Sequence, residues 1–365
     1  MPALADIFRR HGSAYVQQFG SRMPPGHRRV LRDVVRCRTP EAGGQLWHCP
    51  KCGKDHAACH SCGNRHCPTC GGDDARAWLD RQLALQLPVS YYLVTCTVPE
   101  PLRAPTASKP KGYLALLFRS ASRALVDLCR NPKWFGAMPG ITAILHTWTR
   151  SLSYHPHIHF LVTGGGMDPT GAWRQPQTGF LLPAPALSAV FRARFRDGLK
   201  RLDPQTFAAV PAKVWKTDWV VDVTHVGSGE NALKYLARYV FRVALTDSAI
   251  LRHDDTKVTF RYRDSDTGKS RKMSLPVFAF VHRFLQHVLP KGFVKVRYYG
   301  LHHPTHRAAL TLARAQLYLR LNQPLPPPPP VQGKPPMCCP ECKTPMTPGP
   351  RFLPGHLPPT HAPPA

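Results

Sequence analysis

Short apolar runs alternate with amphipathic stretches along the middle of the chain. Residues 91–98 read Tyr-Tyr-Leu-Val-Thr-Cys-Thr-Val, a β-branched and aromatic run that is typical of a buried strand. The same patterns predict helices at 74–87, 113–130, 186–202 and 230–243, strands at 141–148, 157–163 and 214–226, a hairpin over 249–263, and helices near 277–288 and 304–321. Alternation of this kind predicts an α+β sheet domain rather than a helical bundle.

Composition divides the chain into five segments. They are a basic helical segment at 1–35, a Cys- and His-rich block at 36–88, the α+β region at 89–305, a C-terminal helix at 306–323 and a proline-rich tail at 324–365. Pro324 to Pro330 is mostly proline and predicts an extended linker. The tail beyond it contains Cys338 and a Cys339-Pro-Glu-Cys342 knuckle, and its composition predicts disorder.

The chain is strongly basic. Lys and Arg number 49 against 21 Asp and Glu, a formal charge of +28 at pH 7, and the excess extends from Arg9 to Arg351. A folded chain with this charge repels itself unless a polyanion screens it, so nucleic acid is the expected partner. The alternative is a general effect of charge on solubility. No apolar run is long enough to span a bilayer, so we expect no membrane partner.

Seven of the 12 cysteines fall between Cys37 and Cys70. Cys49-Pro-Lys-Cys52 and Cys67-Pro-Thr-Cys70 are two Cys-x2-Cys knuckles separated by 14 residues, a spacing that predicts one structural Zn2+ held by these four thiolates. Further ligand candidates, for a second site or in exchange with these four, are Cys37, Cys59, Cys62, His56 and His66. Metal-bound thiolates favour a reducing cytoplasm over an oxidising compartment.

The segment His155-Pro156-His157-Ile158-His159 opens an apolar run. Side chains alternate faces along a strand, so His157 and His159 point the same way while Ile158 and Phe160 point to the opposite face. Two imidazoles on one face of a central strand can hold a divalent cation if another element supplies a third ligand.

Residues 229–242 form a predicted helix with two tyrosines and three basic residues. Tyr235 and Tyr239 are four residues apart and therefore share a face. Lys234, Arg238 and Arg242 form a second stripe beside them and are the predicted DNA-binding residues. A phenol next to a phosphate clamp can attack phosphorus and become a phosphotyrosine. The alternative is a half-buried pair of tyrosines with solvated basic neighbours.

The histidine–hydrophobe–histidine motif at 157–159, followed by the Tyr235 and Tyr239 pair, resembles the HUH endonuclease superfamily. Three segments narrow the resemblance to the two-tyrosine transposases of the bacterial insertion sequence 91 group: Ser-Cys-Gly-Asn-Arg-His-Cys-Pro-Thr-Cys at 61–70, Tyr-Leu-Ala-Arg-Tyr at 235–239, and Arg-Phe-Leu-Gln-His-Val-Leu-Pro-Lys-Gly-Phe at 283–293.

The resemblance implies a zinc-binding DNA-recognition module at 36–88, followed by a ferredoxin-like, split βαβ nuclease core with added helices. It implies that His157 and His159 bind catalytic Mg2+ or Mn2+, with Glu230 the first choice for a third ligand and Asp222 or His146 as alternatives. Tyr235 and Tyr239 would be the nucleophiles. The implied activity is rolling-circle transposition, in which single-stranded or hairpin element ends are nicked through a 5′-phosphotyrosine and joined to target DNA in the bacterial cytoplasm, at the nucleoid.

Three other functions compete with this one. The first is a nicking enzyme that initiates plasmid replication or conjugation with the same core chemistry. The second is a non-catalytic zinc protein that binds DNA and uses its histidines and tyrosines structurally. The third is a nucleotide hydrolase of the histidine-triad kind, suggested by the alternation of His155, His157 and His159.

Overall fold

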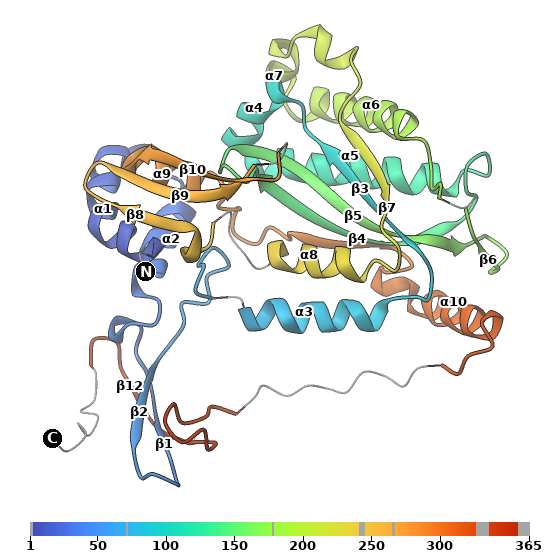
Figure 1. The fold of residues 1–365 in the computed structure, drawn as a ribbon. Helices are drawn as coiled ribbons and strands as arrows, with labels where there is room; N and C mark the ends of the chain where they lie inside the picture. Colours follow the sequence, from blue (N-terminus) through green and yellow to red (C-terminus); the bar gives the residue numbers. More distant parts are fainter. Residues whose placement is uncertain are drawn as a thin grey trace.

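The computed structural model describes residues 3–70, 72–176, 179–240, 245–264, 267–325 and 336–356. A six-stranded antiparallel sheet forms its centre (Figure 1). Five strands follow the order β11-β4-β5-β3-β7, and the short β6 pairs with the end of β5. Their bounds are β3 Tyr91–Thr97, β4 Met138–Trp148, β5 Tyr154–Met167, β6 Trp173–Arg174, β7 Val221–His225 and β11 Val296–Gly300.

The central strands follow the split βαβ topology. Helix α5 (Pro110–Arg130) connects β3 to β4, the β4–β5 hairpin follows, and α6 (Ala184–Leu202) leads towards β7. In chain order these strands are first, second, third and fourth, and they lie side by side in the order 2-3-1-4. This is the ferredoxin-like arrangement, so the α+β class and the split βαβ core expected from the sequence are confirmed. The first and third strands are central and largely buried, which explains their continuous apolar runs.

Two helical layers cover the sheet (Figure 1). Helices α5 and α6 pack on one face, against a core that includes Val94, Ile158 and Phe160. Helices α3 (Gly72–Leu85) and α8 (Glu230–Val240) pack on the other, against Ile144 and Leu161. Helix α10 (Arg307–Arg320) packs beside β6, and the short helices α4 (Arg103–Ser108) and α7 (Pro204–Ala209) flank α5 and α6.

A second, smaller unit combines the N-terminal helices with residues 250–285. Helices α1 (Leu4–Phe19) and α2 (Pro25–Arg36) share one hydrophobic core with α9 (Val277–Leu285) and with a three-stranded sheet, in which β9 (Lys257–Arg263) lies between β8 (Ile250–His253) and β10 (Ser270–Pro276). Phe8 packs edge-on against Phe284 at 5.4 Å between ring centroids. Residues 4–35 are largely helical, as the composition of the segment 1–35 suggests, and their apolar faces are buried against each other and against residues far along the chain.

The C-terminal segment is ordered where the structure describes it, contrary to the prediction of disorder. Strand β12 (Thr347–Phe352) pairs with β1 (Gly44–His48), which pairs in turn with β2 (Asp55–Cys59). Figure 1 shows this small sheet apart from the large one, with the red end of the chain beside the blue one. Backbone pairing and the thiols described below hold the segment despite its proline content.

Other boundaries also differ from those predicted. The expected strand at 214–226 is a 3-10 turn at Ala212–Trp215 followed by β7, since Trp219 turns into the core and interrupts the extended run. The hairpin at 249–263 is confirmed as β8 and β9, and a third strand that was not predicted, β10, pairs with β9. Strand β11 of the large sheet was not predicted either. The last three residues of the predicted helix 230–243 lie outside the described residues.

Candidate functional site

Three histidines meet on the sheet face that α3 and α8 cover. His157 and His159 lie on β5, and His146 lies on the neighbouring strand β4, directly opposite His157 in the register. One ring nitrogen of each histidine can be chosen such that all three lie within 4.8 Å of one another. The predicted placement of His157 and His159 on one face is confirmed by the opposite burial of Ile158 and Phe160 among the α5 and α6 side chains.

Hydrogen bonds orient two of the three rings. His157 Nδ1 lies 2.7 Å from the carbonyl oxygen of His155, to which it donates, and His159 Nδ1 lies 2.9 Å from Thr95 Oγ1 on β3. Both bonds use Nδ1, so the Nε2 atom of each ring is left for a metal. His146 stacks on Trp148 at 5.6 Å between ring centroids. The positions of the rings are therefore fixed by neighbours that are not themselves ligands.

Burial keeps these imidazoles neutral. Loss of hydration lowers the pKa of His157 to about 3 and that of His159 to about 4, and it lowers the pKa of His146 as well. The positive charge of each ring would also disfavour protonation of its neighbours. A neutral imidazole is the form that binds a metal. Three convergent neutral nitrogens fit a divalent ion and leave further coordination positions open for other ligands.

Glu230, the first choice for a third ligand, is not part of this group. Its carboxylate pairs with Lys234 at 2.6 Å on an exposed part of α8. The buried positions of α8 are Ala232, Leu233, Leu236 and Ala237, and helical geometry places residue 230 on the opposite flank from residue 235. The third imidazole comes instead from His146, one of the two alternatives. Its signal in the sequence is a single histidine within an otherwise apolar strand.

Helix α8, which contains the candidate nucleophiles, covers the same face of the sheet. Its apolar side packs on Ile144 and Leu161, each two residues from a histidine of the group and therefore on the same face. Tyr235 is 37% exposed on the flank of this helix. A glycine precedes the helix at Gly229, with φ +77°, where an added Cβ would come within 2.7 Å of Tyr91 and force the helix away from β3.

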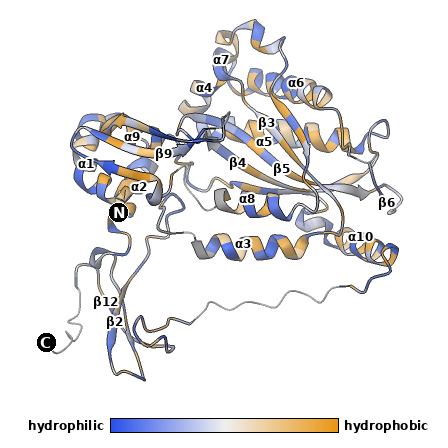
Figure 2. Cartoon of the chain, viewed as in Figure 1, coloured by the Kyte–Doolittle hydropathy of each residue, from blue (hydrophilic) through white to orange (hydrophobic). Residues whose placement is uncertain are grey.

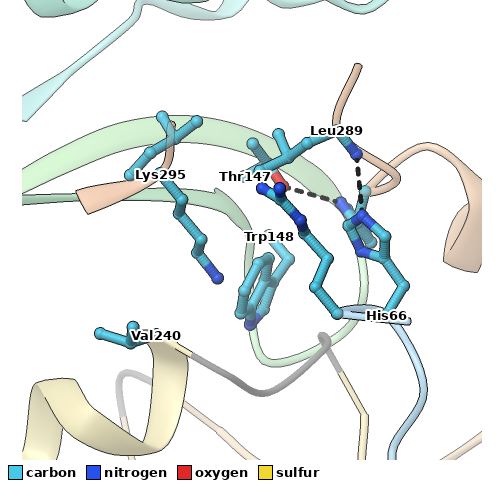
Figure 3. Close-up of a pocket in the computed structure, with 9 residues that line it drawn as sticks. His66, Thr147, Trp148, Val240, Leu289 and Lys295 are labelled. Carbon is cyan, nitrogen blue, oxygen red and sulfur yellow. Dashed lines mark hydrogen bonds between the residues drawn. The ribbon is translucent and has the colours of Figure 1, made fainter. Parts of the chain in front are cut away.

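Tyr239 lies in the last turn of α8, although the structure does not describe its side chain or that of Arg238, and Arg242 lies outside the described residues. Val240, the next residue, lines a small pocket with Trp148, His66 and Lys295 (Figure 3). Lys295 Nζ lies 4.7 Å from the centre of a Trp148 ring, and burial lowers the pKa of Lys295 to about 7. The C-terminal end of α8 thus approaches the tryptophan that stacks on His146.

Two groups of four cysteines lie away from the large sheet. Cys37, Cys62, Cys67 and Cys70 form one group; Cys49, Cys52, Cys339 and Cys342 form the other. The sulfur pairs Cys37–Cys70 and Cys49–Cys342 are each 3.4 Å apart, too far for a disulfide and close to the ~3.8 Å edge of a tetrahedron around zinc. The single site predicted from Cys49, Cys52, Cys67 and Cys70 is therefore wrong in its pairing.

Each knuckle finds at least one of its partners by folding, because that partner lies 30 or more residues away in the sequence. Cys67 and Cys70 are joined by Cys37, at the end of α2, and Cys62. Cys49 and Cys52 are joined by the C-terminal knuckle because β12 pairs with β1. His66 belongs to neither group: it is 8% exposed, and its Nε2 lies 3.3 Å from the backbone nitrogen of Leu289. Cys59 and His56 also lie outside both groups of four, although His56 Nε2 lies 3.4 Å from Cys339 Sγ.

Comparison with known proteins assigns these features to a class. A family described as "Putative transposase" matches residues 140–309, and one described as "Transposase zinc-binding domain" matches residues 7–98. The "Putative transposase y4qJ" of Sinorhizobium fredii is 35% identical over 318 residues, covering 82% of this chain and 80% of the relative. The transposase for insertion sequence element IS801 of Pseudomonas savastanoi pv. phaseolicola is 24% identical over 297 residues, covering 74% and 69%.

A solved structure of the conjugative relaxase TrwC in complex with oriT DNA covers 64% of this chain and 73% of its own, with 14% identity and a TM-score of 0.26. A score this low is not evidence for a shared fold. The two family matches and the Sinorhizobium relative make the chain a transposase. It belongs to the insertion sequence 91 family of transposases, and six of the eight grouped cysteines lie in the part of the chain that matches the zinc-binding domain.

The zinc-binding domain match includes all of the first cysteine group but only Cys49 and Cys52 of the second. In the part of the chain that the structure describes, no helix combines the length and apolar character needed to cross a membrane.

Proposed function

We propose that this transposase nicks single-stranded DNA at the ends of its element through a 5′-phosphotyrosine and then transfers the strand, as in rolling-circle transposition. The observation that carries the proposal is the group of His146, His157 and His159 on the sheet face covered by α8, the helix that contains Tyr235 and Tyr239. The helix with the two candidate nucleophiles therefore covers the sheet face on which the histidine group lies, which supports the proposal.

A divalent ion bound by the three imidazoles would polarise the scissile phosphate. Imidazole ligands suit transition ions better than Mg2+, so we expect Mn2+ to support the reaction better than Mg2+. Thr95 and the His155 carbonyl hold two of the rings that would bind this ion. Lys234, Arg238 and Arg242 are the side chains proposed to contact the DNA backbone near α8, although Glu230 offsets the charge of Lys234.

The tyrosines supply the covalent step. A phenolic oxygen forms a bond to phosphorus as the bond to the 3′ oxygen breaks; the phenol loses its proton and the departing oxygen gains one. The result is a 5′-phosphotyrosine and a free 3′-hydroxyl. Because the phosphodiester energy is retained in the phosphotyrosine, a later 3′-hydroxyl can attack it and rejoin the strand without a nucleotide cofactor. The second tyrosine allows a second strand to be cleaved before the first is released.

The test uses full-length protein, labelled single strands from the flanks of its own gene, and Mn2+ or Mg2+, resolved on a denaturing gel. Wild type should form a covalent protein–DNA band that requires metal and is abolished in Tyr235→Phe/Tyr239→Phe. His157→Ala should lower its rate by roughly 100-fold or more, because metal catalysis contributes several kcal/mol. His155→Ala, on the same strand but outside the histidine group, is the matched control. DNA binding without an adduct on any strand would contradict the proposal.

A further inference from the structure

We propose that the exposed face of the β8–β10 sheet is a binding surface for the phosphate backbone of duplex DNA beside the nicking site. The inference rests on the proposed function in taking DNA as the substrate, but it concerns a surface separate from the histidines and tyrosines. Its residues lie in the segment 252–274, and neither the cysteine groups nor the helix α8 contributes to it.

Strand alternation sorts this sheet into two different faces. Val258 and Phe260 of β9 point inward and are fully buried against α1 and α9. Apart from Pro276 at the end of β10 and the exposed Leu251 at the irregularity in β8, the outward side chains of the three strands are all basic or hydroxyl-bearing. They are Arg252 from β8, Lys257, Thr259, Arg261 and Arg263 from β9, and Ser270, Lys272 and Ser274 from β10.

The positive charges on this face are not held in ion pairs in the part of the chain that the structure describes, although Asp254 lies near Lys257. Among the described residues, the ion pairs include none of Arg252, Lys257, Arg261, Arg263 and Lys272, and all five are exposed. Arg261 and Lys272 occupy directly opposite positions in the antiparallel register, where like charges repel. A surface that gathers positive charge from three strands complements a polyanion and costs the free protein stability.

The residue types on this face favour duplex over single-stranded DNA. Single strands are held by aromatic rings on which bases stack, and the outward positions named above contain no aromatic residue. Tyr262 belongs to the opposite face, where it packs at the edge of the core. Arginine, lysine and hydroxyl groups are instead the side chains that contact phosphate oxygens of a duplex. Thr259 and Ser274, two of these hydroxyl-bearing residues, are hydrogen-bonded to each other across β9 and β10 at 2.8 Å.

The β8–β10 sheet is attached directly to the strands that carry the histidines. Leu152, in the turn between β4 and β5, is fully buried in the core that β8 and β9 share with α9. Arg283 of α9 donates a hydrogen bond to the carbonyl oxygen of Ser151 in the same turn, at 3.4 Å. In Figure 1 the β9–β10 hairpin extends towards the large sheet, and Figure 2 shows that its end is strongly hydrophilic. DNA bound on this face would thus lead towards His157 and His159.

The test compares Arg261→Gln/Arg263→Gln/Lys272→Gln with Lys200→Gln/Arg201→Gln/Lys216→Gln in full-length protein. The control variant removes the same number of exposed charges, but from α6 and the turn before β7, on the side of the large sheet opposite the histidines. Affinity is measured by fluorescence anisotropy, without added divalent metal, for a labelled 25-base-pair duplex and for one of its strands, over a range of KCl concentrations.

The triple variant Arg261→Gln/Arg263→Gln/Lys272→Gln, called the face variant below, should bind the duplex ~10-fold more weakly than wild type. The slope of its log affinity against log salt should become shallower by about 0.9 for each phosphate that the variant no longer neutralises. The control variant should bind the duplex more tightly than the face variant does. Equal loss of duplex affinity in the two variants would overturn the proposal. An equal loss of affinity for the duplex and for the single strand would also overturn it, because the surface would then bind single-stranded DNA as well.

Protein stability provides a second readout. Lys272→Gln alone removes the repulsion across from Arg261, so its melting temperature should equal or exceed that of wild type while its duplex affinity falls. A lower melting temperature with unchanged affinity would mean that the charge serves folding, which contradicts a binding role. Adduct formation on single strands is scored separately, so failure of this surface and failure of the tyrosine chemistry are distinguishable.

Discussion

The thiolate groups and the imidazole group differ in how completely their side chains would surround a metal. Each cysteine group has four ligands, which closes a tetrahedral site, whereas the histidine group has three and leaves positions for water or substrate. The cysteines lie where chain segments are joined: the first group packs beside α1, α2 and α9, and the second connects the two ends of the sequence. The histidines lie on adjacent strands at the centre of the large sheet.

We propose that this difference separates a structural role of the thiolate groups from a catalytic role of the imidazole group. Closed thiolate sites contribute folding free energy to segments that lack a large core of their own. The second cysteine group fits this description, since its cluster of buried residues contains only Cys49, Cys339 and Met346 among the described residues. The histidine group needs no such contribution, because the strands that carry it are buried whether or not metal is present. An open site with oriented neighbours is suited instead to act on a phosphate.

The two cysteine groups should respond differently to the loss of one thiol. Cys67 is 1% exposed and belongs to the core shared by α1, α2 and α9, so Cys67→Ser should lower the free energy of unfolding by roughly 4 kcal/mol or more. Cys342→Ser should release β12 but change the global free energy of unfolding little, because the β12-β1-β2 sheet has a hydrophobic cluster of its own, separate from the larger cores. Urea unfolding and hydrogen exchange of β1 and β12 measure the two effects.

Zinc content provides the control for this comparison. We expect two zinc ions per wild-type chain and one in either serine variant, measured by atomic emission after gel filtration. Cys59→Ser, which removes a cysteine outside both groups, should leave two. Two ions retained in Cys342→Ser would mean that the C-terminal knuckle is not a ligand pair and that the grouping of Cys49 and Cys52 with it is incorrect.

The sequence predicted the histidine group better than the cysteine groups for a physical reason. His157 and His159 point to the same face because side chains alternate along a strand, which is a local property. His146 lies on the adjoining strand of the same β-hairpin, directly opposite His157. The pairing of thiolates depends on which segments meet. Cys52 and Cys339 are brought together by the pairing of β1 and β12, and the spacing of knuckles along the chain contains no information about that.

The same limit applies to the fold. Long periodic segments such as α5 and α6 and the apolar strands β3 to β5 are predicted from local pattern, and the split βαβ order follows once the family resemblance is added. Strand β11 was missed because its burial is intermediate throughout and its pattern weak. The role of Thr95 has no signal at all, since a threonine in a strand is ordinary until a ring nitrogen is placed next to it.

Thr95 provides a smaller test of the histidine group. Thr95→Val keeps the shape of the side chain but removes the oxygen that lies 2.9 Å from His159 Nδ1, so the ring is no longer held in one orientation. We expect the affinity for Mn2+, measured by titration calorimetry, to fall by ~10–100-fold, the usual effect of losing such a partner. Thr95→Ser keeps the hydroxyl and should bind nearly as wild type does. Unchanged affinity in Thr95→Val would show that the strand alone orients His159.

The smallest expected effect concerns His66, which the sequence places among the cysteines and the structure places outside both groups. Burial, with Lys295 and Arg65 nearby, lowers its pKa to about 3 in the native state, against about 6.5 when unfolded. Between these values the unfolded chain binds a proton that the native chain does not, so this residue costs stability as the pH falls, about 1 kcal/mol between pH 6.5 and 5.5. Above pH 6.5 the effect disappears.

His66→Gln should therefore show a flatter decline in urea stability over this range than wild type, with two zinc ions still bound. Loss of a zinc ion would instead make His66 a ligand, and the division between closed thiolate sites and an open imidazole site would no longer hold.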